Sequence, residues 1–185
     1  SAAPTKGGAV AVGIETLGSS RRPLVLRVER GGPKFVALPP VKDFVSLNAV
    51  TSNGGDSLVI VGVTGKPGET KPTSWLSGDG GKTWLQGGSF PTEAAADIST
   101  VSFDPQTAAF VAFGQEQSAD GDQLVSWWSA DGDRWRVQRF NLVEEQTGLD
   151  VSPVGMRVVD VANGVAASVY DSQRGRPIAV FMTSS

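Results

Sequence analysis

The sequence contains no cysteine and no histidine among its 185 residues, and it has a single tyrosine. The absence of cysteine excludes disulfides and thiolate metal sites, and the absence of histidine excludes imidazole bases and Ser-His-Asp triads. A metal ion would have only oxygen ligands, and no calcium-loop spacing occurs. We accordingly expect no metal site and no cofactor.

Long apolar runs and sustained helical periodicity are also absent. No stretch approaches the roughly 18 apolar residues of a transmembrane helix, so no transmembrane segment is expected. The residues Gly78–Thr83 end like a phosphate-binding loop, but they lack its glycine spacing and its strand-to-helix context. The net charge is −3 and the pI is about 5.0, which argues against a nucleic-acid partner.

Turn residues are abundant, and the most informative of them lie in a segment that occurs twice. Ser77-Gly78-Asp79-Gly80-Gly81-Lys82-Thr83-Trp84 is followed by the shortened copy Ser129-Ala130-Asp131-Gly132-Asp133-Arg134-Trp135. Each aspartate can accept backbone N–H bonds in a tight turn, the glycines permit a positive φ, and the tryptophan can pack over the hairpin. We therefore predict structural rather than catalytic roles for Ser77, Asp79, Gly81, Trp84, Ser129, Asp131, Gly132 and Trp135.

The similarity extends to a repeat of about 50 residues. Trp84 and Trp135 are 51 residues apart, and Gly62 and Gly114 are 52 apart. An earlier unit, in which Gly13 matches Gly62 at an offset of 49, has lost the aspartate, and a fourth unit stops where the turn segment would begin. The pattern predicts an all-β fold, a β-propeller or partial propeller of about 3.5–4 four-stranded antiparallel blades. The repeats span approximately residues 7–40, 44–90, 97–140 and 154–185.

Runs of β-branched and aromatic residues predict four strands in each of the two central repeats. The turn segment lies between the third and fourth strands, at the outer edge of each blade. Residues 1–5 are small and predict a flexible start, whereas residues 141–150 predict a loop. The predicted strands are 46–51, 57–63, 72–76 and 84–86 in the second repeat, and 98–103, 109–114, 125–129 and 135–140 in the third.

The two turn segments and their period resemble the Asp-box, or bacterial neuraminidase repeat, of a β-propeller superfamily. This resemblance implies blades with the box as the outer hairpin, and relatives that include sialidases, other glycoside hydrolases, sortilin-type receptors and a photosystem II assembly factor. A sialidase would need an arginine triad, a Tyr–Glu pair and an aspartic acid. Here Tyr170 has no evident glutamate partner, and Gly175-Arg176-Pro177-Ile178 is only a scrambled form of the arginine motif.

Basic residues precede proline at equivalent positions of three repeats: Arg22-Pro23, Lys71-Pro72 and Arg176-Pro177, with Gln123-Leu124 in the third repeat instead. Proline fixes φ and can begin a strand. The charge is also uneven, because residues 1–42 contain seven Lys and Arg and two Glu, a local +5 that leaves −8 for the rest. We predict an anion-recognising rim, the alternative being solvated loop charges. Its candidate residues are Arg21, Arg22, Lys71, Arg174 and Arg176.

Two further features have open interpretations. Trp127 and Trp128 are adjacent, so in a strand one is expected in the core and the other toward solvent or the next blade. An exposed Trp128 would be a candidate binding residue. Glu116 belongs to an acidic group whose members we interpret as solvated loop charges, because their spacing pairs no two carboxylates. The other members are Asp120, Asp122, Glu144 and Glu145.

The sequence thus favours a non-catalytic binding module whose ligand is a protein or an acidic cell-envelope polysaccharide. One alternative is a sialidase-like glycoside hydrolase or a fragment of one, and another is an assembly or scaffold factor that completes a larger propeller. The outer strand missing from the fourth repeat could come from the N-terminal residues, from deleted sequence, or from a second copy or companion chain, because an open sheet edge invites association. A four-bladed ring closed by the N-terminus is the other alternative. The start at Ser1 without Met predicts an exported bacterial protein, secreted or lipid-anchored, or a cut made by processing.

Overall fold

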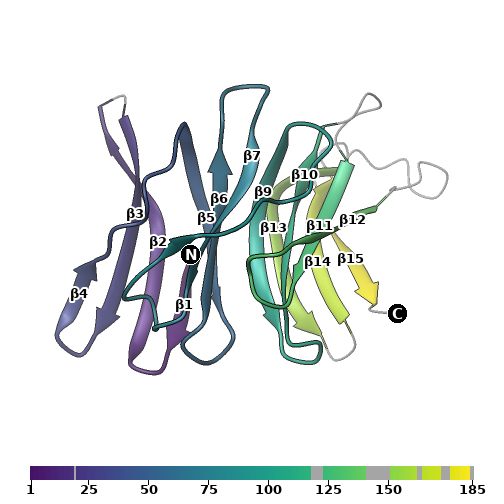
Figure 1. Cartoon of the computed structure of the whole chain (residues 1–185). Coiled ribbons are helices and arrows are strands. Elements are labelled where there is room, and N and C mark those ends of the chain that lie inside the picture. Colours follow the sequence, from purple (N-terminus) through teal and green to yellow (C-terminus); the bar gives the residue numbers. More distant parts are fainter. Residues whose placement is uncertain (19, 118–122, 141–150, 162–163, 172–175, 184–185) are drawn as a thin grey trace.

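A computed structural model describes the backbone of residues 1–18, 20–117, 123–140, 151–161, 164–171 and 176–183, and side chains up to residue 139. Every helix or strand in these residues is a β-strand (Figure 1). The strands form four sheets, and neighbouring strands of each sheet run antiparallel and follow one another along the chain. The predicted all-β class with four-stranded antiparallel blades is therefore confirmed for three of the four sheets.

Sheet A comprises β1 (Ala2–Thr5), β2 (Gly8–Leu17), β3 (Ser20–Glu29) and β4 (Gly32–Phe35). Sheet B comprises β5 (Phe44–Ser52), β6 (Leu58–Thr64), β7 (Lys71–Ser77) and β8 (Leu85–Gln86). Sheet C comprises β9 (Ala96–Asp104), β10 (Ala109–Glu116), β11 (Gln123–Ser129) and β12 (Arg136–Phe140). Sheet D comprises β13 (Val151–Val161), β14 (Gly164–Asp171) and β15 (Arg176–Thr183).

The sheets follow one another in chain order; Figure 1 shows sheet A on the left, sheet B in the middle, and sheets C and D overlapping on the right. The first strands of successive sheets contact one another, β1 with β5, β5 with β9 and β9 with β13. An array of meanders joined along their first strands is the arrangement of propeller blades around an axis. The eight strands predicted for sheets B and C agree with the observed ones to within two residues at each end.

The start of the chain differs from the prediction. Residues 2–5 form β1 rather than a flexible segment, and Ala3 is buried. The terminal ammonium group of Ser1 donates to the Val12 carbonyl at 3.2 Å, and the Val12 N–H donates to the Ser1 carbonyl at 2.8 Å. Small residues fit here because β1 lies between β2 and β5, with which it is in contact.

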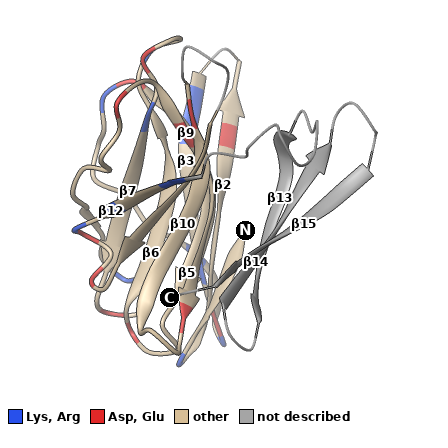
Figure 2. Ribbon diagram, turned by 90° about the vertical axis from the view of Figure 1, so that its right-hand side faces the viewer, with Lys and Arg blue, Asp and Glu red and all other residues tan. Residues whose placement is uncertain are grey.

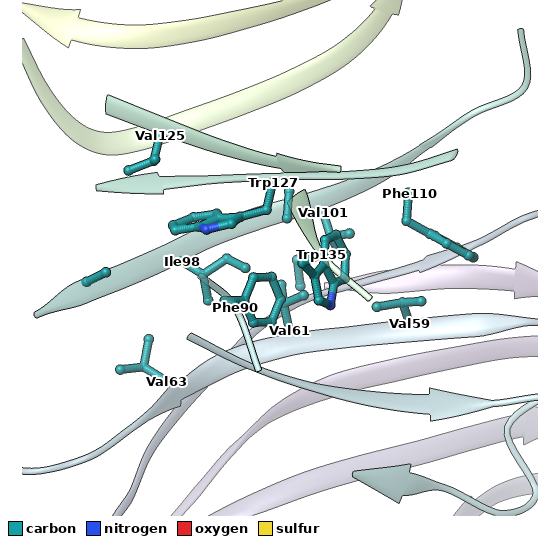
Figure 3. Packing of buried hydrophobic residues seen from close by; sticks show 13 residues of the cluster. Val59, Val61, Val63, Phe90, Ile98, Val101, Phe110, Val125, Trp127 and Trp135 are labelled. Atoms are coloured by element: carbon teal, nitrogen blue, oxygen red, sulfur yellow. The ribbon is translucent and has the colours of Figure 1, made fainter. Parts of the chain in front are cut away.

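The core lies between the sheets, in two clusters. Val10 and Val25 of sheet A pack with Ile60 and Trp75 of sheet B in one cluster. The other cluster joins sheets B and C, and Figure 3 shows its aromatic centre. Side chains of β6 alternate between the clusters, because successive residues of a strand point to opposite faces. Both faces of sheet B are therefore buried. The second cluster includes Val59, Val61, Phe90, Ile98, Phe110, Trp127 and Trp135.

The repeated glycines Gly62 and Gly114 lie opposite irregularities in the first strand of their sheets. A Cβ at Gly62 would be 2.1 Å from the Ser46 carbonyl oxygen, and one at Gly114 would be 1.9 Å from that of Asp97. The 52-residue spacing therefore marks a close backbone approach that is repeated in two sheets.

Candidate functional site

The hairpin between β7 and β8 is closed by the side chains of Ser77 and Asp79. Asp79 Oδ1 accepts the backbone N–H of Lys82 at 2.9 Å and of Thr83 at 3.0 Å, and Oδ2 accepts the Thr83 hydroxyl at 2.6 Å. The Ser77 hydroxyl donates to Asp79 at 2.8 Å and accepts the Gly81 N–H at 2.9 Å. These donors, the Thr83 hydroxyl first, hold the pKa of Asp79 well below its usual range. Such a carboxylate is a turn-closing acceptor and a poor general acid.

The hairpin between β11 and β12 repeats this arrangement with fewer donors. Asp131 Oδ1 accepts the N–H groups of Asp133 and Arg134, each at 2.9 Å, and the Ser129 hydroxyl at 3.0 Å. The two backbone N–H groups, that of Arg134 first, lower the pKa of Asp131. The Ser129 hydroxyl also accepts the Gly132 N–H at 2.9 Å. Both aspartates are therefore committed to their own turns.

Each of these hairpins also packs against the preceding sheet, a contact that the sequence did not predict. Gly81 has φ 82° and lies against Val10 of sheet A, where a Cβ would come within 2.5 Å of the valine Cγ2. Gly132 has φ 77° and lies in the same way against Val59 of sheet B, at 2.6 Å. Val10 and Val59 are 49 residues apart, the repeat offset. The hairpin glycines thus permit both a left-handed turn and close packing between sheets.

The hairpin tryptophans are buried, as predicted. Trp84 is 5% exposed and Trp135 is 6% exposed. Trp135 stacks on Phe90, with ring centroids 4.5 Å apart, and Phe90 meets Trp127 edge to face at 5.5 Å. The aromatic residues of the second hairpin therefore belong to the core between sheets B and C (Figure 3).

The predicted cationic residues occupy equivalent places in the sheets. In register, Arg22 lies opposite Glu15, Lys71 opposite Thr64 and Arg176 opposite Asp171. Each of the three residues lies near the start of the third strand of its sheet, close to the turn that joins the second and third strands. The three therefore lie at the same end of sheets A, B and D. The upper end of β3 is basic in Figure 2. Arg21, Arg22 and Lys71 are exposed and form no ion pair with a described residue. Only backbone is described for Arg176, and Arg174 lies outside the described residues.

Glu116 differs from its interpretation as a solvated charge, because its side chain is only 4% exposed. Burial would raise the pKa of Glu116, but the hydrogen bond from Arg139 and the N–H groups of Glu93 and Ala94 outweigh it, and the pKa is lowered. Arg139 Nε lies 2.7 Å from Glu116, and Arg139 Nη1 lies 3.2 Å from Glu93. Arg139 is 23 residues away, so no local pattern could reveal the pair. Asp120, Asp122, Glu144 and Glu145 lie outside the described residues.

Trp127 is the core residue of the adjacent pair, because it is fully buried and its indole N–H donates to the Pro91 carbonyl at 3.0 Å. Trp128 is partly exposed, and its indole N–H donates to the Ser126 hydroxyl at 3.1 Å. The equivalent residue of sheet B is Leu76, which lies beside Gly132 of the following hairpin. Trp128 therefore occupies a position that serves inter-sheet packing in the preceding repeat.

The described residues contain no group of three or more His, Cys, Asp or Glu suited to hold a metal ion. Every carboxylate in this part of the chain for which a pKa shift is resolved has a lowered pKa. Besides Asp79, Glu116 and Asp131, these carboxylates are Glu29 and Asp104. No helix of the described part has the length and hydropathy needed to cross a membrane. The side chain of Tyr170 is outside the described set.

Comparison with solved structures places the fold among known architectures. A protein of unknown function from Dyadobacter fermentans superposes with a TM-score of 0.63 at 18% identity, over 92% of this chain and 51% of that one. The GH32 β-fructofuranosidase of Bombyx mori, a propeller enzyme, gives a TM-score of 0.54 at 11% identity, over 98% and 48%. A mutant of the same enzyme in complex with sucrose gives 0.53 at 9% identity.

At these identities the likeness shows the fold, a propeller-type arrangement of sheets. The chain spans about half the length of these solved neighbours. No protein-family model and no curated protein matches the chain.

Proposed function

We propose that this chain is a non-catalytic, propeller-type binding module whose cationic end binds an acidic protein surface or an anionic cell-envelope polysaccharide. The cationic end is defined by Arg21, Arg22, Lys71 and Arg176, with Arg174 assigned to it from the sequence. The resemblance of residues 77–84 and 129–135 to Asp-boxes, and an exported, secreted or lipid-anchored location, belong to the same proposal. The bonding of Asp79 and Asp131 within their turns supports the Asp-box interpretation.

The observation that carries the proposal is the repetition of exposed cations at one end of successive sheets. Arg22 and Lys71 lie near the start of equivalent strands in sheets A and B, are exposed, and form no ion pair with a described residue. Unpaired cations repeated at one end of a blade array raise the local concentration of an anionic ligand. In contrast, Arg27, Lys34 and Arg139 lie elsewhere and are paired with carboxylates.

A glycoside hydrolase is the competing function, since one solved neighbour is a β-fructofuranosidase. Such chemistry generally needs two carboxyl groups facing one bond, one of them with a raised pKa. In the part of the chain with described side chains, the shifted carboxylates are instead turn acceptors or members of ion pairs. Turnover of fluorogenic sialosides or fructosides by the purified chain, abolished by a single Asp or Glu substitution, would replace the binding proposal.

Binding of poly-L-glutamate and of polygalacturonate tests the proposal directly. The variant Arg22→Ala/Lys71→Ala/Arg176→Ala should bind both probes at least about tenfold more weakly, with a smaller salt dependence, because three cations are lost from one end. The matched control is Arg30→Ala/Lys82→Ala/Arg134→Ala. It removes the same charge from the hairpins at the opposite end of the third strands, so it should retain binding. If both variants weaken binding equally, the binding depends only on the net charge of the protein, and the proposal of a specific cationic end is overturned.

A further inference from the structure

One face of sheet A is apolar and open. In the register of β2, β3 and β4, Ala11 lies opposite Leu26 and Leu26 lies opposite Phe35, so these side chains share a face. Ala9 and Val28 form the next pair on the same side. Phe35 is 79% exposed and Val28 is 40% exposed. We call this surface the free face of sheet A; its members are Ala9, Ala11, Leu24, Leu26, Val28 and Phe35.

The same face is buried in the next sheet of the row. At the repeat offset of 49, Ala11 corresponds to Ile60 and Leu26 to Trp75, and Ile60 lies opposite Trp75 as Ala11 lies opposite Leu26. Ile60 and Trp75 are fully buried against Val10 and Val25 of sheet A. Sheet C repeats the contact, with Phe110 and Trp127 buried against sheet B. The free face is therefore the surface that sheets B and C each use to receive the preceding sheet.

The hairpin glycines show the same difference. Gly81 and Gly132 each lie against a valine of the preceding sheet, whereas a Cβ at Gly32, with φ 97°, would have no atom within 4 Å. Gly32 has a positive φ like Gly81 and Gly132, but it does not contact another sheet as they do. Sheet A thus has the local geometry of a receiving blade.

We propose that a second copy of this chain docks head-to-tail on the free face of sheet A. Sheet D of the second copy would pack on sheet A of the first copy in the same way that sheet A packs on sheet B within one chain. Such a contact continues the interface already present twice in the row and repeats its rotation. Two copies would supply eight sheets, the upper end of the usual range of four to eight propeller blades.

The charge distribution disfavours a contact between two copies of sheet A. Residues 1–42, which contain sheet A, carry a formal charge of +5, so a sheet A to sheet A contact would bring like charges together. At the edge of the free face Arg22 lies opposite Glu15, so the apolar centre has a polar rim, as in protein interfaces.

The first test is sedimentation velocity over a concentration series at low and moderate salt. The native chain should associate, and Phe35→Asp should weaken association by at least about tenfold because it places a charge on the apolar free face. Val28→Asp should act likewise. Leu85→Asp is the matched control, since Leu85 is 73% exposed on β8 outside the free face. A native chain that stays monomeric, or a control that weakens association as much as Phe35→Asp, would overturn the proposal.

The second test uses the absence of cysteine to distinguish the two geometries. In a head-to-tail dimer the two Phe35 side chains lie in different contacts, so oxidised Phe35→Cys should form a disulfide no faster than Leu85→Cys. Rapid cross-linking of Phe35→Cys would indicate that sheet A packs on sheet A, which contradicts the proposed geometry. Hydrogen exchange should, upon association, slow in β3–β4 and in β14–β15 together. Circular dichroism of each variant establishes that it is folded, independently of any binding by the cationic end.

Discussion

At the scale of single residues, the two hairpin aspartates occupy equivalent positions but differ in their donors. Asp79 accepts two backbone N–H groups and two hydroxyls, from Ser77 and Thr83, whereas Asp131 accepts two backbone N–H groups and the hydroxyl of Ser129. Hydrogen bonds to a charged acceptor stabilise more than those between neutral groups. The Thr83 hydroxyl, at 2.6 Å, therefore makes the first hairpin the stronger of the two.

Asp79 should make stability depend on acid pH. Its folded-state pKa is lowered, so its contribution is fully present above the ordinary carboxyl pKa of about 3.9 and is lost as pH falls through the lower folded value. Asp79→Asn should cost about 1–2 kcal/mol at neutral pH, because the charge-assisted bonds weaken. Its free energy of unfolding should then change less between pH 5 and pH 2 than that of the native chain. Urea titrations monitored by tryptophan fluorescence measure both quantities, and Asp131→Asn should show the smaller effect.

The hairpin glycines separate backbone strain from packing. Alanine at Gly32 should cost about 1 kcal/mol for its positive φ alone, because its Cβ would meet no other atom. Alanine at Gly81 or Gly132 should cost about 1–3 kcal/mol more, because the Cβ would overlap Val10 or Val59. Combining Gly81→Ala with Val10→Ala should recover part of that excess. Purely additive effects in this double-mutant cycle would show that the contact between sheets does not limit the site.

At the scale of elements, the buried Glu116 connects the end of β10 to the segment at residues 93–94 and to Arg139 of β12. Arg139 pairs with two carboxylates that differ in burial, since the side chain of Glu116 is 4% exposed and that of Glu93 is 78% exposed. Glu116→Gln should cost about 1–3 kcal/mol, because the partly buried Arg139 and two backbone N–H groups lose a charged acceptor. Glu93→Gln is the matched control and should cost at most about 0.5 kcal/mol. If chemical denaturation gives the same loss of unfolding free energy for both variants, the buried position of Glu116 adds nothing to the stability of the ion pair.

The strands could be predicted because their signals are local. Runs of β-branched and aromatic residues and an Asp–Gly turn each act within one hairpin, so the strands of sheets B and C were predicted to within two residues. Contacts between distant segments were not predictable in this way. Three such contacts are the Glu116–Arg139 ion pair, the packing of Gly81 against Val10, and the placement of β1 beside β5. They depend on how strands and sheets come together in space, which the sequence of a single hairpin does not indicate. The equivalent strand positions of Arg22 and Lys71 follow from the repeat, whereas a ligand for them has no local signature and their binding role stays a prediction.

At the scale of the whole molecule, burial is unequal along the row of sheets. Val59, Ile60 and Val61 of β6 are at most 1% exposed, since sheet B is covered on both faces. Among the side chains that the structure describes, sheet A is packed against another sheet only on its Val10 side. In arrays of stacked repeats each unit is stabilised by its neighbours, and a unit with one neighbour opens more easily. Sheet A should therefore be less stable locally than sheet B.

Native-state hydrogen exchange of the dilute chain measures this difference. Amide protons of β6 and β10 should exchange most slowly, and those of β2 and β3 at least about tenfold faster, because opening sheet A exposes one buried face instead of two. Phe35→Asp should leave this order unchanged in dilute solution, as Phe35 contributes to the free face rather than to the packing against sheet B. Val25→Ala should accelerate exchange in β2 and β3 more than in β10, because Val25 is buried only against sheet B. Uniform exchange in all three sheets would instead indicate that the row unfolds as one cooperative unit, with no terminal sheet able to open alone.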